Sequence, residues 1–338
     1  MILSINRLSG VVLGMAALAL VSAAACGGGG ASGEPTRTED PALTAIVTMY
    51  PLEEFTSRIG GQRVEVTNLL PAGADAHSFE ASPSDLRSIA EADVLIYNGL
   101  GFESWVEGML DSVGDDVEMV LAAAPESLGE EFEDSHEEGE EHDEEGAHTE
   151  DHEGPEVEEN HDHGPLDPHV WLDPVRARVQ VERIRDALTE LDPDGESAFR
   201  ENADQLLGDL QELHEDYASA LASCRLDVFI TSHDAFNYLA DRYGLHADGI
   251  SGINPHSSPS AAQLSHLSRE MSELGVEHIL VSPLESQRLS DTLAAETGAT
   301  VLTLHTVQNL TPVERQAGED YFSIMRDNLD NLAAALDC

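Results

Sequence analysis

The alternation of short β-branched segments with helical segments constrains the fold most, and it occurs twice along the chain. The first run covers residues 43–113 and includes the apolar segment VLIYNGLG, which we expect to be a buried strand over 94–101. The second run covers residues 225–305 and contains the strand-like segments EHILVSP and ATVLTLH. Strands that alternate with helices predict parallel sheets. We therefore expect an α/β protein with two lobes, each with a mostly parallel sheet flanked by helices.

A long helical segment separates the two runs. From Glu196 to Ser223, leucines and Tyr217 recur at the spacing of one helical stripe. This pattern predicts an N-terminal lobe over 43–191, one long rigid linking helix over 192–223 and a C-terminal lobe over 224–338. Open sheets bind ligands at the ends of their strands, so two such lobes predict a cleft between them.

An acidic segment interrupts the first lobe at about residues 126–166. Its core, 130–163, holds 18 Asp and Glu residues and no arginine. Such a segment has little apolar surface to offset the entropy of ordering, so we expect it to be disordered. It also carries six irregularly spaced histidines, namely His136, His142, His148, His152, His161 and His163. They could form weak auxiliary metal sites, or the segment could be a passive charged linker.

The start of the chain has the order of a secretory signal. Arg7 precedes an apolar run over 10–25, which ends in small residues before Cys26. The run is short for a membrane span, so we expect 1–25 to be a signal peptide. We expect Cys26 to be lipidated and 26–42 to be a flexible tether, which places the protein outside the cytoplasm as a membrane-anchored lipoprotein. An ordinary signal peptide followed by an incidental cysteine is the alternative.

Two cysteines remain in the expected folded body. Cys224 and Cys338 are too few for a disulfide scaffold, but they suit a single bridge in an oxidising compartment. We predict that they pair.

The charge balance is strongly acidic throughout. The chain has 66 acidic residues and 16 arginines without a lysine, and removing the acidic core changes the formal net charge only from −50 to −32. The acidity argues against nucleic acid as a partner, because phosphates would be repelled. It suits cation capture, and adaptation to a salty habitat is the alternative explanation.

Four histidines outside the acidic segment occupy similar positions. They are His77, His169, His233 and His305, and each follows an expected strand or precedes an expected helix, two in each lobe. Any one of them could be an ordinary, partly buried side chain. Together they could converge on one cleft, where four imidazoles would suit a zinc ion.

The sequence also resembles the metal-binding solute-binding proteins of bacterial ABC importers, in the cluster that captures zinc or manganese. The resemblance covers about residues 43–338 apart from the acidic segment. It rests on LLPAGADAHSFEASPSDL, ADVLIYNGLGFESWV, DPHVWLDP, TSHDAFNYLADRYGL, SPSAAQL and ETGATVLTLHTV. It implies a monomeric binding protein that delivers its metal to an ABC permease with its ATPase.

The resemblance also assigns metal ligands. The first three ligands of the family fall on His77, His169 and His233, and a histidine at the third place indicates zinc. The fourth ligand is usually an aspartate, but this chain has His305 there, so the fourth bond could come from His305, from water or from a carboxylate. Four neutral imidazoles would leave the full charge of the ion uncompensated. We therefore expect carboxylates to hydrogen-bond the imidazoles, with Asp173, Asp234 and Glu285 as candidates.

The leading functional hypothesis is capture and delivery of Zn2+, the transported ligand, without catalysis. Some zinc-type members of the family carry a similar insert, and we interpret the acidic segment as an antenna that gathers zinc for the cleft. A zinc hydrolase would need an open coordination position and a general base, and no HExxH motif is present. A surface adhesin or a zinc buffer that uses the same cleft is the other alternative.

Overall fold

The computed structural model describes residues 41–109, 117–123 and 166–338. The expected signal peptide over 1–25, the lipidation site Cys26 and the six histidines of the acidic segment lie outside the described residues. None of the helices in the described ranges is both long and apolar enough to cross a bilayer.

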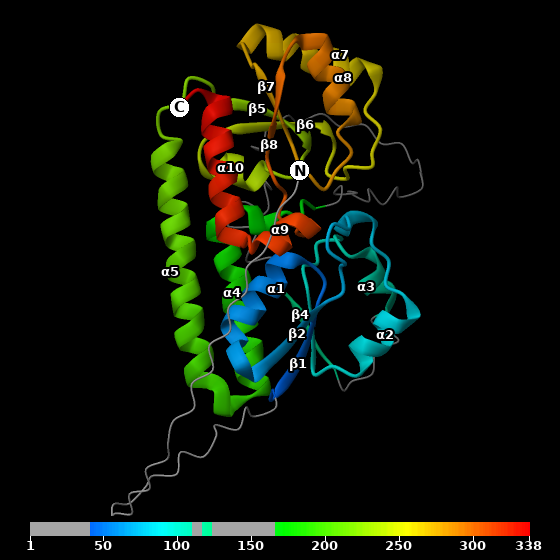
Figure 1. The fold of residues 1–338 in the computed structure, drawn as a ribbon, viewed down its shortest axis with the longest axis vertical. Coiled ribbons are helices and arrows are strands. Elements are labelled where there is room, and N and C mark those ends of the chain that lie inside the picture. Colours follow the sequence, from blue (N-terminus) through cyan, green and yellow to red (C-terminus); the bar gives the residue numbers. More distant parts are fainter. Residues whose placement is uncertain (1–40, 110–116, 124–165) are drawn as a thin grey trace, which may run out of the picture. The chain divides into compact units, whose positions relative to one another are not determined.

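The first lobe, in the lower half of Figure 1, contains a four-stranded parallel sheet. Its strand order is β2-β1-β3-β4. Buried Val, Ile and Leu side chains fill its central strands, as expected for a sheet covered on both faces. Its elements are β1 (Leu43–Val47), α1 (Tyr50–Gly60), β2 (Val64–Asn68), α2 (Pro83–Ala90), β3 (Val94–Tyr97), α3 (Ser104–Met109) and β4 (Glu118–Leu121).

The second lobe repeats this topology with the strand order β6-β5-β7-β8, again all parallel. In each sheet the first strand of the sequence is central, the second strand pairs on one side of it and the later strands are added on the other side. This change of side creates a switch point at the carboxyl ends of the first and third strands. The elements are β5 (Val228–His233), α6 (Asn237–Arg242), β6 (His246–Ser251), α7 (Ala261–Leu274), β7 (His278–Val281), α8 (Arg288–Thr297), β8 (Thr300–Thr303), α9 (Pro312–Ala317) and α10 (Tyr321–Leu336).

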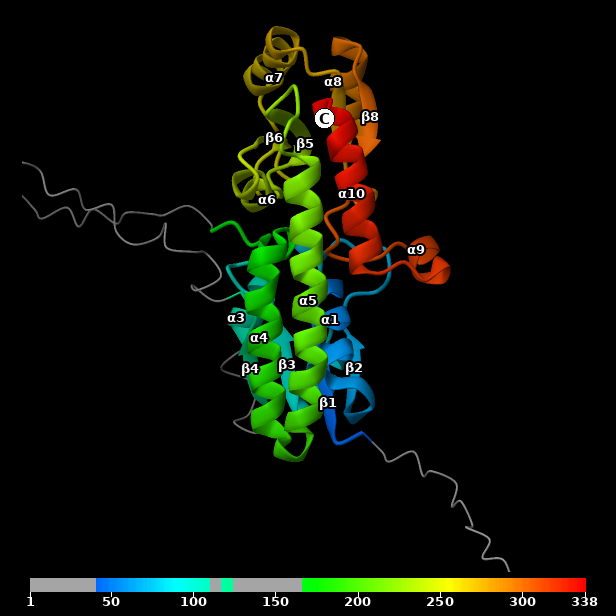
Figure 2. The same cartoon turned by 90° about the vertical axis from the view of Figure 1, so that its left-hand side faces the viewer.

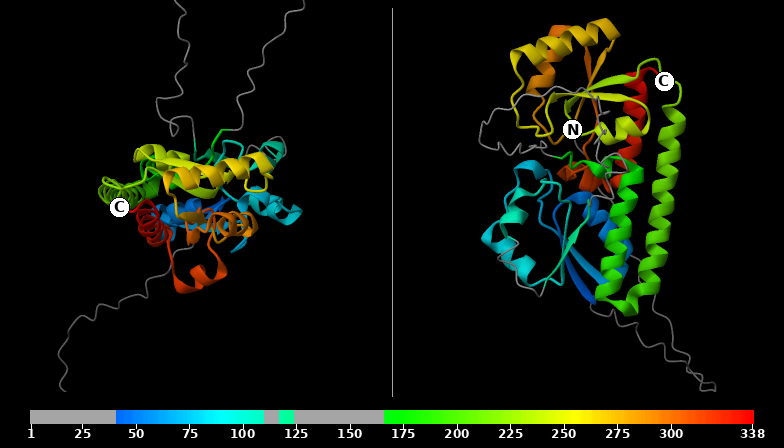
Figure 3. Two further views of the ribbon diagram at one scale, coloured as in Figure 1. Left: turned by 90° about the horizontal axis from the view of Figure 1, so that it is seen from above. Right: turned by 180° about the vertical axis from the view of Figure 1, so that it is seen from behind.

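Two long helices lie between the lobes in the sequence. They are α4 (Pro174–Leu191) and α5 (Glu196–Ala220), and they pack against each other as an antiparallel pair (Figures 2 and 3). The 25 residues of α5 extend over about 38 Å at the usual helical rise. This length allows α5 to contact α1 of the first lobe and α10 of the second. The position of α5 falls within the 192–223 range expected for the linking helix.

The predicted strand over 94–101 is shorter in the structure. β3 ends at Tyr97, and the chain then turns through Gly99, Leu100 and Gly101, which all have positive φ. Gly99 has a φ of +87°, which strains any residue with a side chain, and a β-carbon there would also lie 2.0 Å from Leu121 Cδ1, so this turn favours glycine. The next helix, α3, begins after this turn at Ser104.

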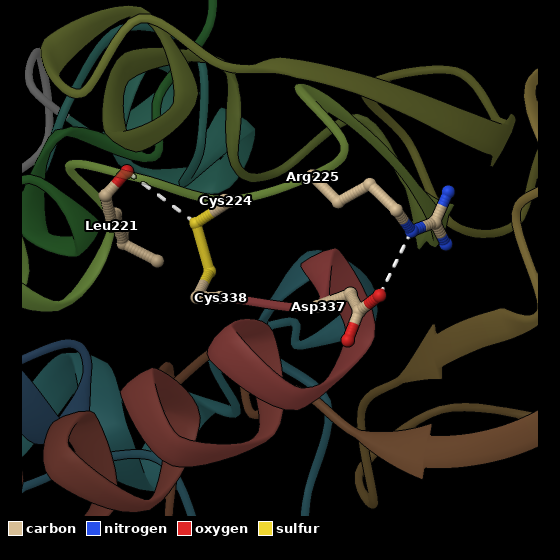
Figure 4. Close-up of a disulfide and its surroundings, with 5 residues drawn as sticks. All are labelled: Leu221, Cys224, Arg225, Asp337 and Cys338. Atoms are coloured by element: carbon tan, nitrogen blue, oxygen red, sulfur yellow. Dashed lines mark hydrogen bonds and ion pairs between the residues drawn. A yellow bond between two sulfur atoms is a disulfide. The ribbon is translucent and has the colours of Figure 1, made fainter.

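The two cysteines of the described chain form a disulfide (Figure 4). Cys224, just after α5, is bonded to Cys338, two residues after α10 ends, and the bond closes a loop with a sequence separation of 114. Beside it, Arg225 Nε lies 2.8 Å from Asp337 Oδ2. The bond therefore fixes the C-terminal end of the chain to the start of the second lobe.

Candidate metal centre

Three of the four histidines meet where the two lobes face each other. His77 lies on the loop after β2, His169 begins the short 3-10 turn Val170–Leu172 before α4, and His233 ends β5. Their ligand nitrogens all lie within 4.8 Å of one another. His169 and His233 are fully buried, and His77 is half-buried. We call these three side chains the histidine centre.

The spacing of the nitrogens fits a tetrahedral ion. His169 Nε2 lies 3.2 Å from His77 Nε2 and 3.4 Å from His233 Nε2. Nitrogens bound tetrahedrally to zinc at its usual bond length would be separated by about 3.3 Å. The centre therefore already has the dimensions of a zinc site on these two edges.

Carboxylates hold two of the three imidazoles through the opposite ring nitrogen. His169 Nδ1 lies 2.8 Å from Asp167 Oδ1, and His233 Nδ1 lies 3.1 Å from Glu285 Oε2. With the proton on Nδ1, both rings present the lone pair of Nε2 to the centre. The two carboxylates also offset the double charge of a divalent cation, which would be costly to bury alone.

Ionisation favours the metal-binding form of the centre. Burial, together with the neighbouring imidazoles of His169 and His233, lowers the pKa of His77 to about 2. Burial also lowers the pKa of His169, against the opposing effect of Asp167. Burial by itself would raise the pKa of Glu285, but the contacts with His233 and Ser232 outweigh it and lower the pKa. The imidazoles of His77 and His169 are therefore neutral, and Glu285 is ionised, near neutral pH.

Residues that we did not single out in the sequence position His169. Asn98 Nδ2, after β3, donates to the carbonyl oxygen of Pro168 at 2.9 Å, and Gln180 Nε2 donates to Asn98 Oδ1 at 3.0 Å. The buried carboxylate of Glu103 accepts from the backbone nitrogens of Asn98 and Gly99, both at 2.9 Å. Asp167 could have been found from the sequence, because it stands two positions before His169 in the pattern DPH. The contact of Asn98 with Pro168 spans 70 residues, and no local pattern indicates it.

The centre also joins the two lobes. Asn309 Nδ2, in the second lobe, donates to the carbonyl oxygens of Pro71 and Ala74 on the loop that carries His77, at 2.7 and 3.0 Å. Trp171 Nε1 donates to the carbonyl oxygen of Thr306 at 2.8 Å, and the hydroxyl of Tyr321 donates to the carbonyl oxygen of Trp171 at 2.6 Å. The positions of His77 and His169 therefore depend on the second lobe.

His305, one of the candidates for the fourth ligand, lies outside the histidine centre in the structure. Its Nδ1 accepts a hydrogen bond from the backbone nitrogen of Val307 at 2.8 Å, and its Nε2 lies 3.3 Å from Glu314 Oε2. The contact with His305 lowers the pKa of Glu314 to about 2. The backbone of His305 is also paired with the side chain of Asn328. These contacts turn His305 towards α9 and α10.

Two of the three expected carboxylates also have other partners. Asp173 caps α4 by accepting from the backbone nitrogen of Val175 at 2.9 Å, and it accepts from Arg242 Nη2 at 2.8 Å. Asp234 Oδ1 accepts from the backbone nitrogen of Gly249 at 2.7 Å. A β-carbon on residue 249 would lie 2.3 Å from that oxygen, so the close contact depends on glycine. Of the three candidates, only Glu285 has a hydrogen bond to an imidazole of the centre among the described contacts.

The lowered pKa of His77 predicts a pH dependence of the metal-free fold. Between its unfolded pKa of about 6.5 and its folded pKa of about 2, His77 takes up a proton only on unfolding, so the free energy of unfolding falls by about 1.4 kcal/mol per pH unit as the pH drops through this range. Urea unfolding of the metal-free protein at pH 7, 6 and 5 measures it. The loss from pH 6 to 5 should be smaller in a His77→Asn variant, and equal losses would contradict the prediction.

With this fold and this centre, the chain belongs to the class of two-lobed metal-binding proteins. Residues 46–335 match the family described as zinc-uptake complex component A, periplasmic, and the chain is a member of that family.

Three similar proteins illustrate the relationship. The high-affinity zinc uptake system protein ZnuA of Bacillus subtilis is 34% identical and covers 93% of each chain. The zinc-binding lipoprotein AdcA of Streptococcus pneumoniae is 36% identical over 88% of this chain, which spans only 56% of that longer relative. The Zn(II)-bound ZnuA-like domain of the pneumococcal AdcA aligns with a TM-score of 0.69 at 33% identity, covering 88% of this chain and 99% of that structure.

Proposed function

We propose that this protein captures Zn2+ in the histidine centre, outside the cytoplasm, and delivers it to an ABC permease driven by its ATPase. The observation that carries the proposal is the meeting of three imidazole nitrogens from two lobes at tetrahedral spacings, 3.2 and 3.4 Å on two edges. Nitrogen ligands favour zinc over manganese, which lies at the weak end of the affinity order. The names of the similar proteins, which describe zinc binding and zinc uptake, support the same cargo.

Binding without catalysis is the second part of the proposal. Three imidazoles leave one tetrahedral position to water or to another side chain, so the number of ligands alone does not exclude a hydrolase. A hydrolase would need a general base on the open side of the ion. Asp167 and Glu285, the two carboxylates hydrogen-bonded to the imidazoles, are instead engaged on the far nitrogens of His169 and His233. Membership of a zinc-uptake family also supports a carrier.

Titration of the metal-free full-length chain tests the function. We expect one tight equivalent of zinc, and cobalt in its place should give the intense visible absorption of a tetrahedral, nitrogen-rich site. The spectrum should not change when small anions are added if the chain itself fills the fourth position, and a change would show that an exchangeable water occupies it. A weak, oxygen-type cobalt spectrum, or the absence of a tight equivalent, would contradict zinc capture.

We further propose that residues 130–163 act as an antenna for zinc and that the lipidated Cys26 anchors a monomeric carrier to the membrane. In the same titration, deletion of 130–163 should remove weak equivalents and leave the tight one. Loss of the tight equivalent would show that the segment itself provides the main site.

A further inference from the structure

A cavity of about 390 Å³ lies beside the histidine centre, against residues of both lobes. Asp75 and Ser78, on either side of His77, line it from the first lobe. Ser232, which precedes His233, and Glu285 line it from the second lobe. The lining therefore includes direct sequence neighbours of His77 and His233, two of the three histidines of the centre.

The lining of this cavity consists mainly of oxygen donors. Seven of its fourteen lining residues are serines, two are the carboxylates Asp75 and Glu285, and one is the imidazole of His256. Arg288 is the single cationic side chain among them. Oxygen donors of this kind suit a divalent cation that keeps part of its water shell.

Glu285 has one oxygen that the histidine centre does not use. Its Oε2 accepts from Ser232 Oγ at 2.7 Å and contacts His233 Nδ1 at 3.1 Å. Its Oε1 is buried and has no hydrogen-bond partner among the described residues, and the whole side chain is only 4% exposed. A carboxylate oxygen in such a place requires a partner, because burying a polar atom without a hydrogen bond is costly.

Asp75 connects the rim of the cavity to the centre. Its Oδ2 lies 2.9 Å from His256 Nε2, on the loop between β6 and α7. Its Oδ1 accepts from the backbone nitrogen of His77 at 2.9 Å. His77 is also the only imidazole of the centre that is not fully buried, so the side of the centre next to Asp75 is the accessible one.

We propose that this cavity is an outer cation site, in which Asp75, His256 and Glu285 hold a partly hydrated divalent ion on its way to the histidine centre. Among the described residues, only the three imidazoles of the centre lie close enough together to bind a bare ion directly. The outer site therefore binds through water and more weakly. This inference rests on the proposed function, since it assigns the route by which zinc reaches the same centre.

Manganese is a suitable probe for the outer site. It is paramagnetic, it favours oxygen ligands, and it competes poorly for three imidazoles that already hold zinc. In the full-length protein loaded with one equivalent of zinc, added manganese should broaden the backbone amide signals of Ser257, Ser258 and Ser286. Broadening of the amide signals of residues 130–163 would report manganese binding to the acidic segment separately from binding in the cavity.

A matched pair of variants makes this test specific. Asp75→Asn keeps an oxygen that can accept from the backbone of His77 but removes the charge, and it should raise the manganese concentration needed for broadening about tenfold. Asp85→Asn makes the same change at the start of α2, away from the cavity lining, and should have no effect. Absence of broadening at the three serines, or equal broadening in Asp75→Asn, would overturn the outer site.

Kinetics test whether the outer site lies on the route. Manganese at the concentration that half-fills the cavity should lower the association rate of zinc with the metal-free wild type by about half. The rate in Asp75→Asn, with its tenfold weaker site, should fall by only about a tenth at that concentration. A wild-type rate that is insensitive to manganese would overturn the proposed route. These outcomes are separate from the proposed function, because a tight zinc equivalent in the titration establishes the centre whatever manganese does.

Discussion

Replacement of His169 by alanine is expected to weaken zinc binding by about 100- to 1,000-fold. Structural zinc sites bind with roughly 10–16 kcal/mol, so each of four ligands contributes about 2.5–4 kcal/mol. Among the three histidines, His169 should give the largest loss of zinc affinity when it is removed, because its Nε2 lies within 3.4 Å of the ligand nitrogens of both others. Its removal also leaves Asp167 without the imidazole that it orients.

Competition with a chromophoric zinc chelator measures this loss, and His214→Ala is the matched control. His214 is another histidine with an aromatic neighbour, since its Nδ1 lies 3.2 Å from the hydroxyl of Tyr243, but it belongs to α5 and not to the centre. The control should bind zinc as the wild type does. If His169→Ala stays within a factor of ten of the wild type while folded by circular dichroism, zinc binds elsewhere.

Removal of the disulfide should give the largest loss of stability. For a sequence separation of 114, the chain-entropy estimate is about 4.8 kcal/mol, and native disulfides usually contribute about 2–5 kcal/mol. The bond also holds α10, whose residues are largely buried and whose Met325 carbonyl accepts from the hydroxyl of Tyr217 on α5 at 2.6 Å. The double variant Cys224→Ser/Cys338→Ser avoids a free thiol.

Urea unfolding of the oxidised wild type and of the double variant, both metal-free, measures the difference in the free energy of unfolding. Reduced wild type is the control, and it should match the double variant if the covalent bond itself stabilises the fold. A difference below about 1 kcal/mol would contradict the prediction, because native bridges over long loops contribute more than this.

Most of the architecture could be predicted from local patterns. The alternation of strands and helices gave two parallel-sheet lobes, and the structure shows two four-stranded parallel sheets. The strand over 94–101 was too long, because apolar content alone does not reveal that Leu100 takes a positive φ between two glycines. We predicted no element after His305 from the sequence, although α10 supplies much of the core of the second lobe.

The candidate site was predictable where it depends on strand ends and not where it depends on contacts between lobes. His77, His169 and His233 follow strands or precede helices, and parallel topology brings such positions together. His305 occupies the same kind of position, but its ring is held by Val307 and Glu314. No local pattern distinguishes it from the other three, because those contacts come from the turn and helix that follow it.

The hydrogen bonds of Trp171 have a consequence for unloading. Trp171 lies two residues after His169, on the same short turn, and is bonded through its indole and its carbonyl to the other lobe. An ion cannot lose His169 by a shift of that turn unless these two buried bonds also break. Spontaneous dissociation of the ion should therefore be slow. Its release should require another molecule that separates the two lobes at Trp171 by breaking these two hydrogen bonds.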